Sequence, residues 1–191
     1  MGEAPYDPRI VANLILETRK FIGLSTTQIE LQKLLYFCYE AFLIQRRQRL
    51  TLGYFEAWQY GPVHPDVYRA FKAFRGTPIT EYAKSTDPFT RETKALPRLE
   101  DPDIRRHVVE TVTKLSGLTS FELVNLSHAP DGPWHSVVKS AKESVALGLR
   151  ITDDTILSNR PHGMLMREGH HTATRGVVPD DEEPLTRNGP L

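Results

Sequence analysis

The sequence predicts an all-α fold, a compact bundle of six to seven short helices with at most a small β-hairpin, followed by a disordered C-terminal tail. Three observations predict it. Apolar residues recur at helical spacing in several separate segments, most of these segments begin with a capping residue or a proline, and most end at a glycine. We assign residues 1–160 to the helical domain and residues 161–191 to the tail.

The first two helices are predicted from their starts and their apolar faces. Asp7 followed by Pro8 suits a helix start, and Gly23 ends this first helix. Thr27 and Glu30 form a capping-box pattern at the start of the second helix. The apolar face of the second helix follows at helical spacing and comprises Leu31, Leu34, Leu35, Cys38 and Phe42.

The next segment predicts an extended run, a bend and a third helix. Residues 51–60 are rich in aromatic residues and short, which is typical of a small strand. Gly61-Pro62 interrupts this run, and His64-Pro65 then begins the third helix, which ends near Gly76. Residues 79–100 contain two prolines and many polar residues, so we expect an irregular connection, with or without a short hairpin.

More helices are predicted before residue 160. The fourth begins at Asp101-Pro102 and ends near Gly117. A second capping-box pattern, Thr119 with Glu122, opens a short fifth helix. The turn SHAPDGPW at residues 127–134 follows, and a sixth helix then runs from its proline to a glycine at position 148.

Thr152 caps one last helical turn. After residue 160 the amino-acid composition of the chain changes. The remaining segment has no aromatic residue, four prolines and an acidic run at residues 180–183. Such a composition buries too little apolar surface to offset an ordering entropy of about 1–2 kcal/mol per residue. We therefore predict a disordered tail.

Composition and charge narrow the function classes. Lys plus Arg and Asp plus Glu both total 24, so the chain lacks the basic excess of a protein that grips nucleic acid along its length. Its one cysteine, Cys38, excludes an internal disulfide and a thiolate zinc site. No apolar run reaches membrane-spanning length, and the N-terminus lacks a secretion-signal pattern. We expect a cytoplasmic protein without membrane association.

The motifs of common enzyme classes are missing, so we expect no catalytic residues and no cofactor. The sequence has no Gly-x-Ser-x-Gly elbow, no dinucleotide or Walker loop, and no His-Glu-x-x-His. Cys38 lies on an apolar helix face, which is typical of an inert core thiol. His128 and His135 could converge across their turn, but no third ligand accompanies them, so no metal is expected.

The stretch AWQYGPVHPDVY, residues 57–68, is interpreted first as structure. Gly61 and Pro62 force a bend that turns the chain from the extended run into the third helix, and the aromatic rings stabilise this elbow by packing. Tyr60 and His64 are expected to keep their polar tips near the surface. A rim for binding a partner is the secondary interpretation.

Three blocks of the sequence resemble the Panacea antitoxin domain: LQKLLYFCYEAFL at 31–43, AWQYGPVHPDVY at 57–68 and SHAPDGPW at 127–134. The resemblance is to the SocA-like group, which includes phage-associated proteins of the GepA type, and it spans residues 8–158. It implies an all-helical antitoxin that neutralises a toxin encoded beside it, usually by direct contact. SocA-type members are described as adaptors that deliver a toxin to the ClpXP protease.

The same resemblance implies the hallmark residues Gln32, Lys33, Leu34, Tyr36, Trp58, Tyr60, Gly61, Pro62, Val63, Tyr68, His128 and Trp134. We divide most of these by chemistry and add His64, which lies in the same stretch. Lys33 is expected at the edge of the apolar face of the second helix, within reach of a carboxylate. The side chains expected to bind a partner are Lys33, Tyr36, Trp58, Tyr60, His64, Tyr68 and His128. Those expected to be structural are Leu34, Gly61, Pro62, Val63 and Trp134.

We therefore expect an interaction protein rather than an enzyme. It would be the antitoxin of a toxin–antitoxin system, with its toxin and ClpX or ClpXP as partners, and would bind the toxin in a groove between the elbow and neighbouring helices. Two alternatives stay open. One is a nucleic-acid-binding or regulatory protein that uses Arg46, Arg47 and Arg49. The other is an uncharacterised hydrolase that uses His64 and His128.

Overall fold

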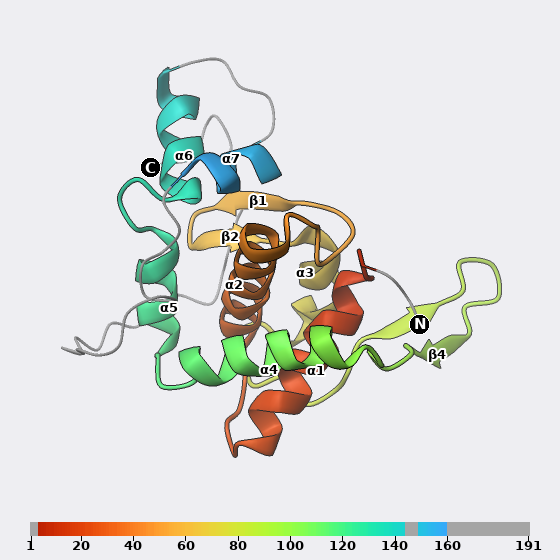
Figure 1. The fold of residues 1–191 in the computed structure, drawn as a ribbon. Coiled ribbons are helices and arrows are strands. Elements are labelled where there is room, and N and C mark those ends of the chain that lie inside the picture. Colours follow the sequence, from red (N-terminus) through yellow and green to blue (C-terminus); the bar gives the residue numbers. More distant parts are fainter. Residues whose placement is uncertain (1–3, 144–148, 160–191) are drawn as a thin grey trace.

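The computed structural model describes residues 4–143 and 149–159, which form a helical body with two small sheets (Figure 1). The helices are α1 (Pro8–Phe21), α2 (Gln28–Arg46), α3 (Pro65–Phe71), α4 (Pro102–Leu115), α5 (Ser120–Ser127), α6 (Pro133–Glu143) and α7 (Asp153–Ser158), with a short 3-10 helix, η1, at Lys72–Phe74. The strands are β1 (Phe55–Trp58), β2 (Gly61–Val63), β3 (Lys84–Thr86), β4 (Thr93–Ala95) and β5 (Arg150–Ile151).

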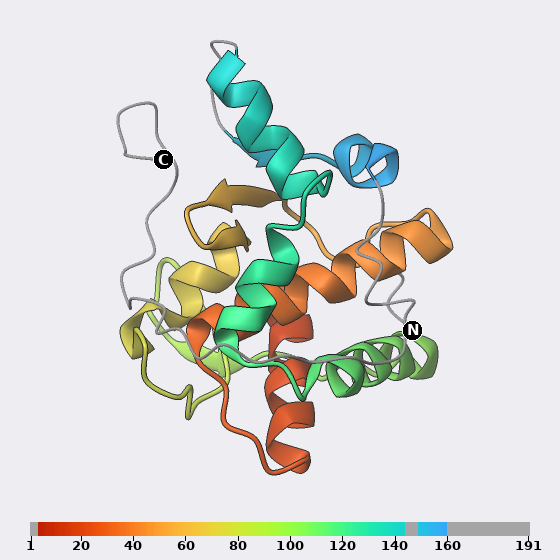
Figure 2. The same cartoon turned by 90° about the vertical axis from the view of Figure 1, so that its left-hand side faces the viewer.

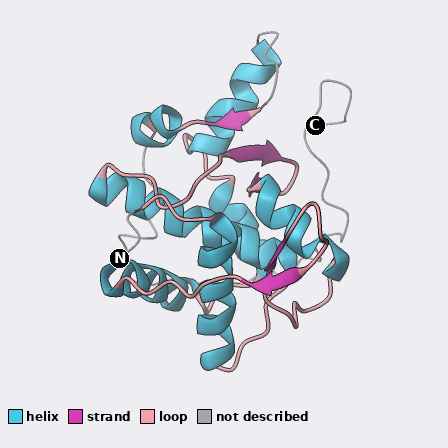
Figure 3. Cartoon of the chain, turned by 90° about the vertical axis from the view of Figure 1, so that its right-hand side faces the viewer, coloured by secondary structure: helices cyan, strands magenta, loops and turns pink. Residues whose placement is uncertain are grey.

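The strands correct the all-α expectation, because they form two sheets instead of one small hairpin. β1 lies in the middle of a three-stranded antiparallel sheet, with β2 on one side and β5 on the other. β3 and β4 form a separate hairpin that projects from the helical body (Figures 1 and 3). The mainly helical prediction is confirmed, whereas the expected limit of one small β-hairpin is wrong. β5 has only two residues, and its partner β1 lies far from it in the sequence, so no local pattern predicts this strand.

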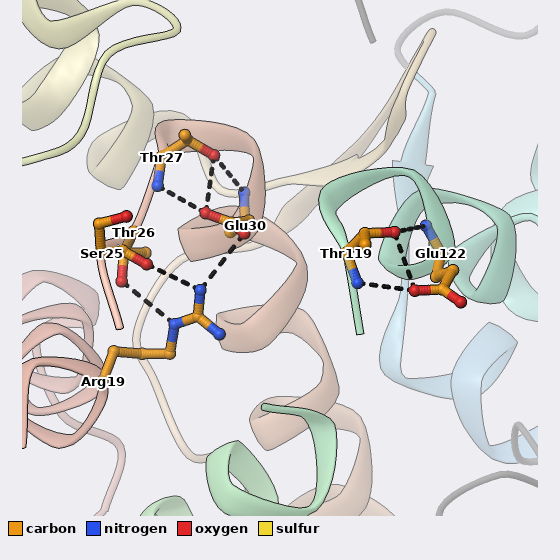
Figure 4. Close-up of polar contacts among 7 residues, drawn as sticks. All are labelled: Arg19, Ser25, Thr26, Thr27, Glu30, Thr119 and Glu122. Carbon is orange, nitrogen blue, oxygen red and sulfur yellow. Dashed lines mark hydrogen bonds and ion pairs between the residues drawn. The ribbon is translucent and has the colours of Figure 1, made fainter. Parts of the chain in front are cut away.

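The predicted helix starts are confirmed by their capping geometry. The carboxylates of Asp7 and Asp101 accept hydrogen bonds from backbone N–H groups in the first turns of α1 and α4. Both capping boxes are complete: each threonine side chain accepts from the backbone three residues on, and the glutamate accepts from the threonine backbone in return. These boxes are Thr27–Glu30 and Thr119–Glu122 (Figure 4).

α2 is the central helix, and it is buried on every side from Leu31 to Leu43. α1, α4, α5 and α7 surround it together with β2 and α3 (Figures 1 and 2). The expectation of a single apolar face is therefore wrong for this helix, because a helix enclosed by neighbours has no solvent side along its middle. Polar residues within this span consequently lie in the core.

The elbow differs in detail from the prediction. Gly61 and Pro62 belong to β2 and do not interrupt the sheet, and the turn of the β1–β2 hairpin lies at Gln59 and Tyr60. α3 begins at Pro65 as predicted. The chain therefore reverses first in the tight turn and only then enters the helix.

No helix in the described part of the chain is long and apolar enough to cross a membrane. The predicted tail, residues 161–191, lies outside the described residues, and so does the predicted end of the sixth helix at residues 144–148.

Candidate functional site

Gly61 of β2 lies against one side chain of α2 and one side chain of α5. Its φ of +101° is a conformation that L side chains rarely adopt. A Cβ at this position would lie 2.3 Å from Ser127 Oγ and 3.0 Å from Lys33 Cε. Position 61 therefore requires glycine for both its backbone and its surroundings, which supports the expected structural role.

Lys33 lies inside the protein and not at the edge of an apolar face. Its exposed fraction is 0%, and Nζ donates a hydrogen bond to the carbonyl of Pro62 at 3.1 Å. The expectation of an edge position fails because α2 is enclosed by its neighbours. This hydrogen bond holds β2 against α2. Without it the buried carbonyl of Pro62 would have no donor, which costs about 1–3 kcal/mol.

Tyr36 lies on the same buried helix, one turn further along. Its hydroxyl donates to Glu40 Oε1 at 3.3 Å, and its ring packs edge-on against Phe55 with the centroids 5.2 Å apart. Burial raises the pKa of this phenol well above its usual range, with the Glu40 carboxylate as a smaller cause. Tyr36 thus joins α2 to β1 from within the core.

His64 is also buried, with 1% of its surface exposed, so the expected polar tip near the surface is wrong. Its backbone N–H donates to Gln32 Oε1 at 2.8 Å, and its Nε2 lies 2.9 Å from the carbonyl of Leu52. A carbonyl only accepts, so Nε2 carries the proton and donates. Burial lowers the pKa of His64. The neutral ring fixes the start of α3 against the loop before β1.

Four rings, Trp58, Tyr68, His128 and Trp134, form an aromatic cluster over the β1–β2 hairpin. Trp134 Nε1 donates to the carbonyl of Trp58 at 2.9 Å, and the Trp58 ring packs against Tyr68 at a centroid distance of 4.7 Å. His128 stacks on Trp134 at 3.8 Å with 23° between the planes. Tyr68, His128 and Trp134 are half-buried, as is Tyr60 in the adjacent turn. The cluster joins two of the three predicted blocks, residues 57–68 and residues 127–134.

His128 differs chemically from an ordinary surface histidine. Its Nε2 is buried and makes no hydrogen bond within the described part of the chain. Burial lowers the pKa of His128 to about 4, and the positive charge of Lys33 adds to this effect. The ring is therefore neutral at pH 7 and presents a flat, partly apolar face.

The side chains considered for catalysis, Cys38, His64 and His128, form no contact with one another in the described part of the chain. Cys38 is fully buried and its thiol pKa is raised by that burial, which confirms the prediction of a core thiol. His64 and His128 are committed to separate contacts on Leu52 and Trp134. Across residues 4–143 and 149–159, no group of three metal-ligating side chains lies close enough to hold an ion.

The arginines considered for nucleic-acid binding are only partly free. Arg46 and Arg47 are exposed at the end of α2. Arg49 pairs with Asp153 of α7 at 2.5 Å, and the same carboxylate accepts from the hydroxyl of Tyr39 at 2.6 Å. Arg49 therefore anchors α7 to the body, which weakens its case as a phosphate ligand.

Two surface grooves lie on either side of the segment before the projecting hairpin. The first, here called the α3 groove, has a volume of about 740 Å³ and lies between the start of α1, α3 and residues 81–86. The second, about 620 Å³, lies between α1, residues 80–84 and residues 95–99. None of the side chains expected to bind a partner lines either groove. No local sequence pattern indicates these grooves, because their walls come from segments far apart in the chain.

Ser127 and Glu40 are site residues that the sequence interpretation missed. Ser127 is fully buried against Gly61, and its hydroxyl donates to the carbonyl of Val124 at 2.8 Å. Glu40 is fully buried beside Tyr36. A carboxylate one turn after a tyrosine, on an otherwise apolar helix, was a usable signal for Glu40, whereas no local pattern marks Ser127.

The fold and site define a mainly helical domain in which polar residues of an enclosed central helix position an aromatic cluster. Residues 31–135 match the "Antitoxin SocA-like, Panacea domain" family. The chain is also 35% identical over 150 residues to Antitoxin SocA of Caulobacter vibrioides (strain NA1000 / CB15N), covering 78% of this chain and 80% of that relative. No solved structure matches it significantly. The chain therefore belongs to the SocA-like antitoxin family with a Panacea domain.

Proposed function

We propose that the protein is an antitoxin that binds and neutralises its cognate toxin by direct contact. The relative named Antitoxin SocA supports this role for a chain that matches it along most of its length. The observation that carries the proposed contact surface is the aromatic cluster, with half-buried rings held by hydrogen bonds and stacking. Rigid aromatic side chains are common anchors of protein interfaces, with truncation costs of about 2 kcal/mol or more.

Within this proposal the expected partner-binding residues have two different roles. Lys33, Tyr36 and His64 act from inside, because each is at most 1% exposed in the free protein and holds β1, β2 or the start of α3 in place. The toxin contacts come from Tyr60 and from the half-buried members of the cluster beside it, Tyr68, His128 and Trp134. Trp58 is buried and supports Tyr68 by packing against its ring. No catalytic step is part of the mechanism.

Co-expression with the product of the neighbouring gene tests the function itself. The full chain is expected to restore growth of cells that produce the toxic neighbour and to be captured with it in a pull-down. The proposal fails if the chain neither rescues growth nor binds that product.

Two tyrosines test the contact surface. Tyr68→Ala and Tyr60→Ala are expected to weaken toxin binding about tenfold or more, because each removes a ring from the proposed contact. Tyr54→Ala is a matched control: Tyr54 is also partly exposed but lies at the other end of β1, under the guanidinium of Arg150. Equal losses from all three variants would contradict a localised surface.

We further propose that the antitoxin acts in the cytoplasm as an adaptor that brings the toxin to ClpXP. The family resemblance supports this step, and linking cargo and protease through one chain would raise their effective concentration. Deletion of residues 161–191 tests the contribution of the tail. Unchanged toxin turnover after that deletion removes the tail from the mechanism and leaves the domain as the adaptor.

A further inference from the structure

The hairpin of β3 and β4 has backbone groups on its outer edge that the fold leaves available. All six strand residues are exposed. The amide of Asp87 donates to the carbonyl of Glu92, so this pair bonds across the hairpin. Bonded and non-bonded pairs alternate in an antiparallel ladder, and the register is Ser85↔Lys94 and Thr86↔Thr93. The backbone N–H and C=O of Ser85 therefore point toward β4, while those of Lys84 and Thr86 point away from β4.

This outer edge of β3 runs along the α3 groove. The carbonyl of Lys84 accepts a long bond of 3.4 Å from Arg9 Nη1, and Lys84, Arg9 and Thr86 all line the groove. Outside the β3–β4 ladder, Thr86 makes no backbone–backbone hydrogen bond within the described part of the chain. The groove thus has a strand edge as one wall and α3 as the other.

The base of the hairpin is held firmly, so this edge is presented in a fixed place. The Asn13 side chain bonds both backbone groups of Ala83, accepting from its N–H at 2.8 Å and donating to its carbonyl at 3.0 Å. At the tip, Asp87 Oδ1 accepts from the amides of Phe89 and Thr90, both at 2.8 Å. A fixed edge reduces the entropy that a bound partner must offset.

The charges of the groove argue against a small ionic ligand. Its cations Arg9, Arg69 and Lys84 are already paired with acids of the same walls, namely Asp7, Asp66 and Glu81. The walls also include apolar surface from Leu52, Ala70 and Phe74. A neutral, partly apolar ligand fits these surroundings better than a phosphate or a carboxylate.

The spacing of the edge groups identifies the kind of ligand. Lys84 and Thr86 are two residues apart, which is about 6.8 Å along a strand. An extended backbone repeats its own donors and acceptors at this spacing, with alternate side chains on one face. The groove volume of about 740 Å³ lies within the usual range of ligand sites.

We propose that the α3 groove binds an extended segment of the toxin, which adds to β3 as a third strand. This inference rests on the proposed antitoxin function. Main-chain bonds to Lys84 and Thr86 supply affinity, and apolar side chains of the segment contact Leu52 and Phe74, which are exposed and half-buried in the groove wall. α3 lies between the two surfaces, since Tyr68 belongs to the aromatic cluster and Ala70 lines the groove. One partner can therefore contact both.

A pair of proline variants tests strand addition, with the purified product of the neighbouring gene as the probe. Thr86→Pro removes one outward N–H from the groove edge, whereas Thr93→Pro removes the equivalent N–H from the opposite edge of the same hairpin. Both changes cost the hairpin a similar amount. We expect Thr86→Pro to weaken toxin binding about three- to tenfold, and Thr93→Pro to leave it within about twofold.

Two further measurements are independent of the prolines. Ala70→Trp fills the groove from α3 and is expected to weaken binding at least about tenfold, with circular dichroism confirming the fold. Amide exchange at Lys84 and Thr86 is expected to slow when toxin is added to the full chain. Equal binding by Thr86→Pro and Thr93→Pro, with wild-type binding by Ala70→Trp, overturns this inference alone. Absence of wild-type binding overturns the proposed function together with it.

Discussion

At the scale of single residues, the contact at Gly61 joins three parts of the chain. The residue itself lies in β2, Lys33 comes from α2 and Ser127 from the end of α5. The Gly-Pro pair indicated from the sequence that this position is structural. The reason could not be predicted, because the two side chains that exclude a Cβ are far from Gly61 in the sequence. Lys33 was misplaced for the same reason, since its burial depends on elements that surround α2.

Alanine substitutions at three glycines distinguish the cost of a positive φ from the cost of the close contact around an added Cβ. Gly61→Ala is expected to destabilise the fold by about 2–4 kcal/mol, from backbone strain plus overpacking. Gly23→Ala has the backbone cost alone, because φ is +79° but nothing lies within 4 Å, so about 1 kcal/mol is expected. Gly117→Ala has neither cost and is expected to be nearly neutral. Urea unfolding measures all three, and equal costs at positions 61 and 23 would show that the close contact is unimportant.

His128 predicts a pH dependence of stability. The folded pKa is about 4, below the ordinary value of 6.5, so between these values the unfolded chain binds more protons. Stability contributed by the neutral ring is full above pH 6.5 and falls as the pH falls toward 4. His128→Phe keeps a ring on Trp134 and removes the titration. Its denaturant midpoint is expected to fall less than that of the wild type between pH 7 and pH 5, and parallel curves would contradict this.

At the scale of elements, local signals predicted helix starts well and helix surroundings poorly. A capping residue bonds to groups within four residues of itself. The N-caps Asp7, Thr27, Asp101 and Thr119 could therefore be predicted from the sequence alone. Which side of a helix meets solvent depends on its neighbours. α2 therefore looked one-sided in the sequence and is enclosed in the structure. Both capping boxes look alike in sequence, but they differ in what their glutamates contact.

The two glutamates of the capping boxes form a matched pair. Glu30 also contacts Arg19 at 3.3 Å, and Arg19 is 4% exposed (Figure 4). Glu30→Gln leaves this buried guanidinium with Ser25 and Thr26 as neutral partners. Glu122→Gln alters a more exposed box. We expect Glu30→Gln to cost about 1–3 kcal/mol more, because a buried charge loses its carboxylate. Equal unfolding midpoints for the two variants would contradict this role of Glu30.

At the scale of the whole molecule, residues after α6 complete structures that begin near the N-terminus. β5 adds a third strand to β1, and α7 lies beside this sheet and packs on α2 (Figure 1). Asp153 of α7 bonds both Tyr39 and Arg49. The sequence predicted the helical turn of α7 from its Thr152 cap. It could not predict that this segment closes the fold, because pairing across most of the chain has no local signature. The boundary near residue 160 remains a prediction.

Two truncations test that boundary and the closing role of the last described elements. A chain of residues 1–159 retains β5 and α7, and we expect it to unfold within about 0.5 kcal/mol of the full chain. A chain of residues 1–143 loses the buried side chains of Ile151 and Ile156, which contribute about 1.5–3 kcal/mol each, and the bond from Tyr39 to Asp153. A loss of about 3–6 kcal/mol is a large part of a typical domain stability, so this shorter chain is expected to be mostly unfolded at 37 °C.

Circular dichroism during urea unfolding compares the three proteins. Cooperative unfolding of 1–143 at the full-length midpoint would show that the closing segment is dispensable, and a marked loss in 1–159 would place the domain boundary beyond residue 160.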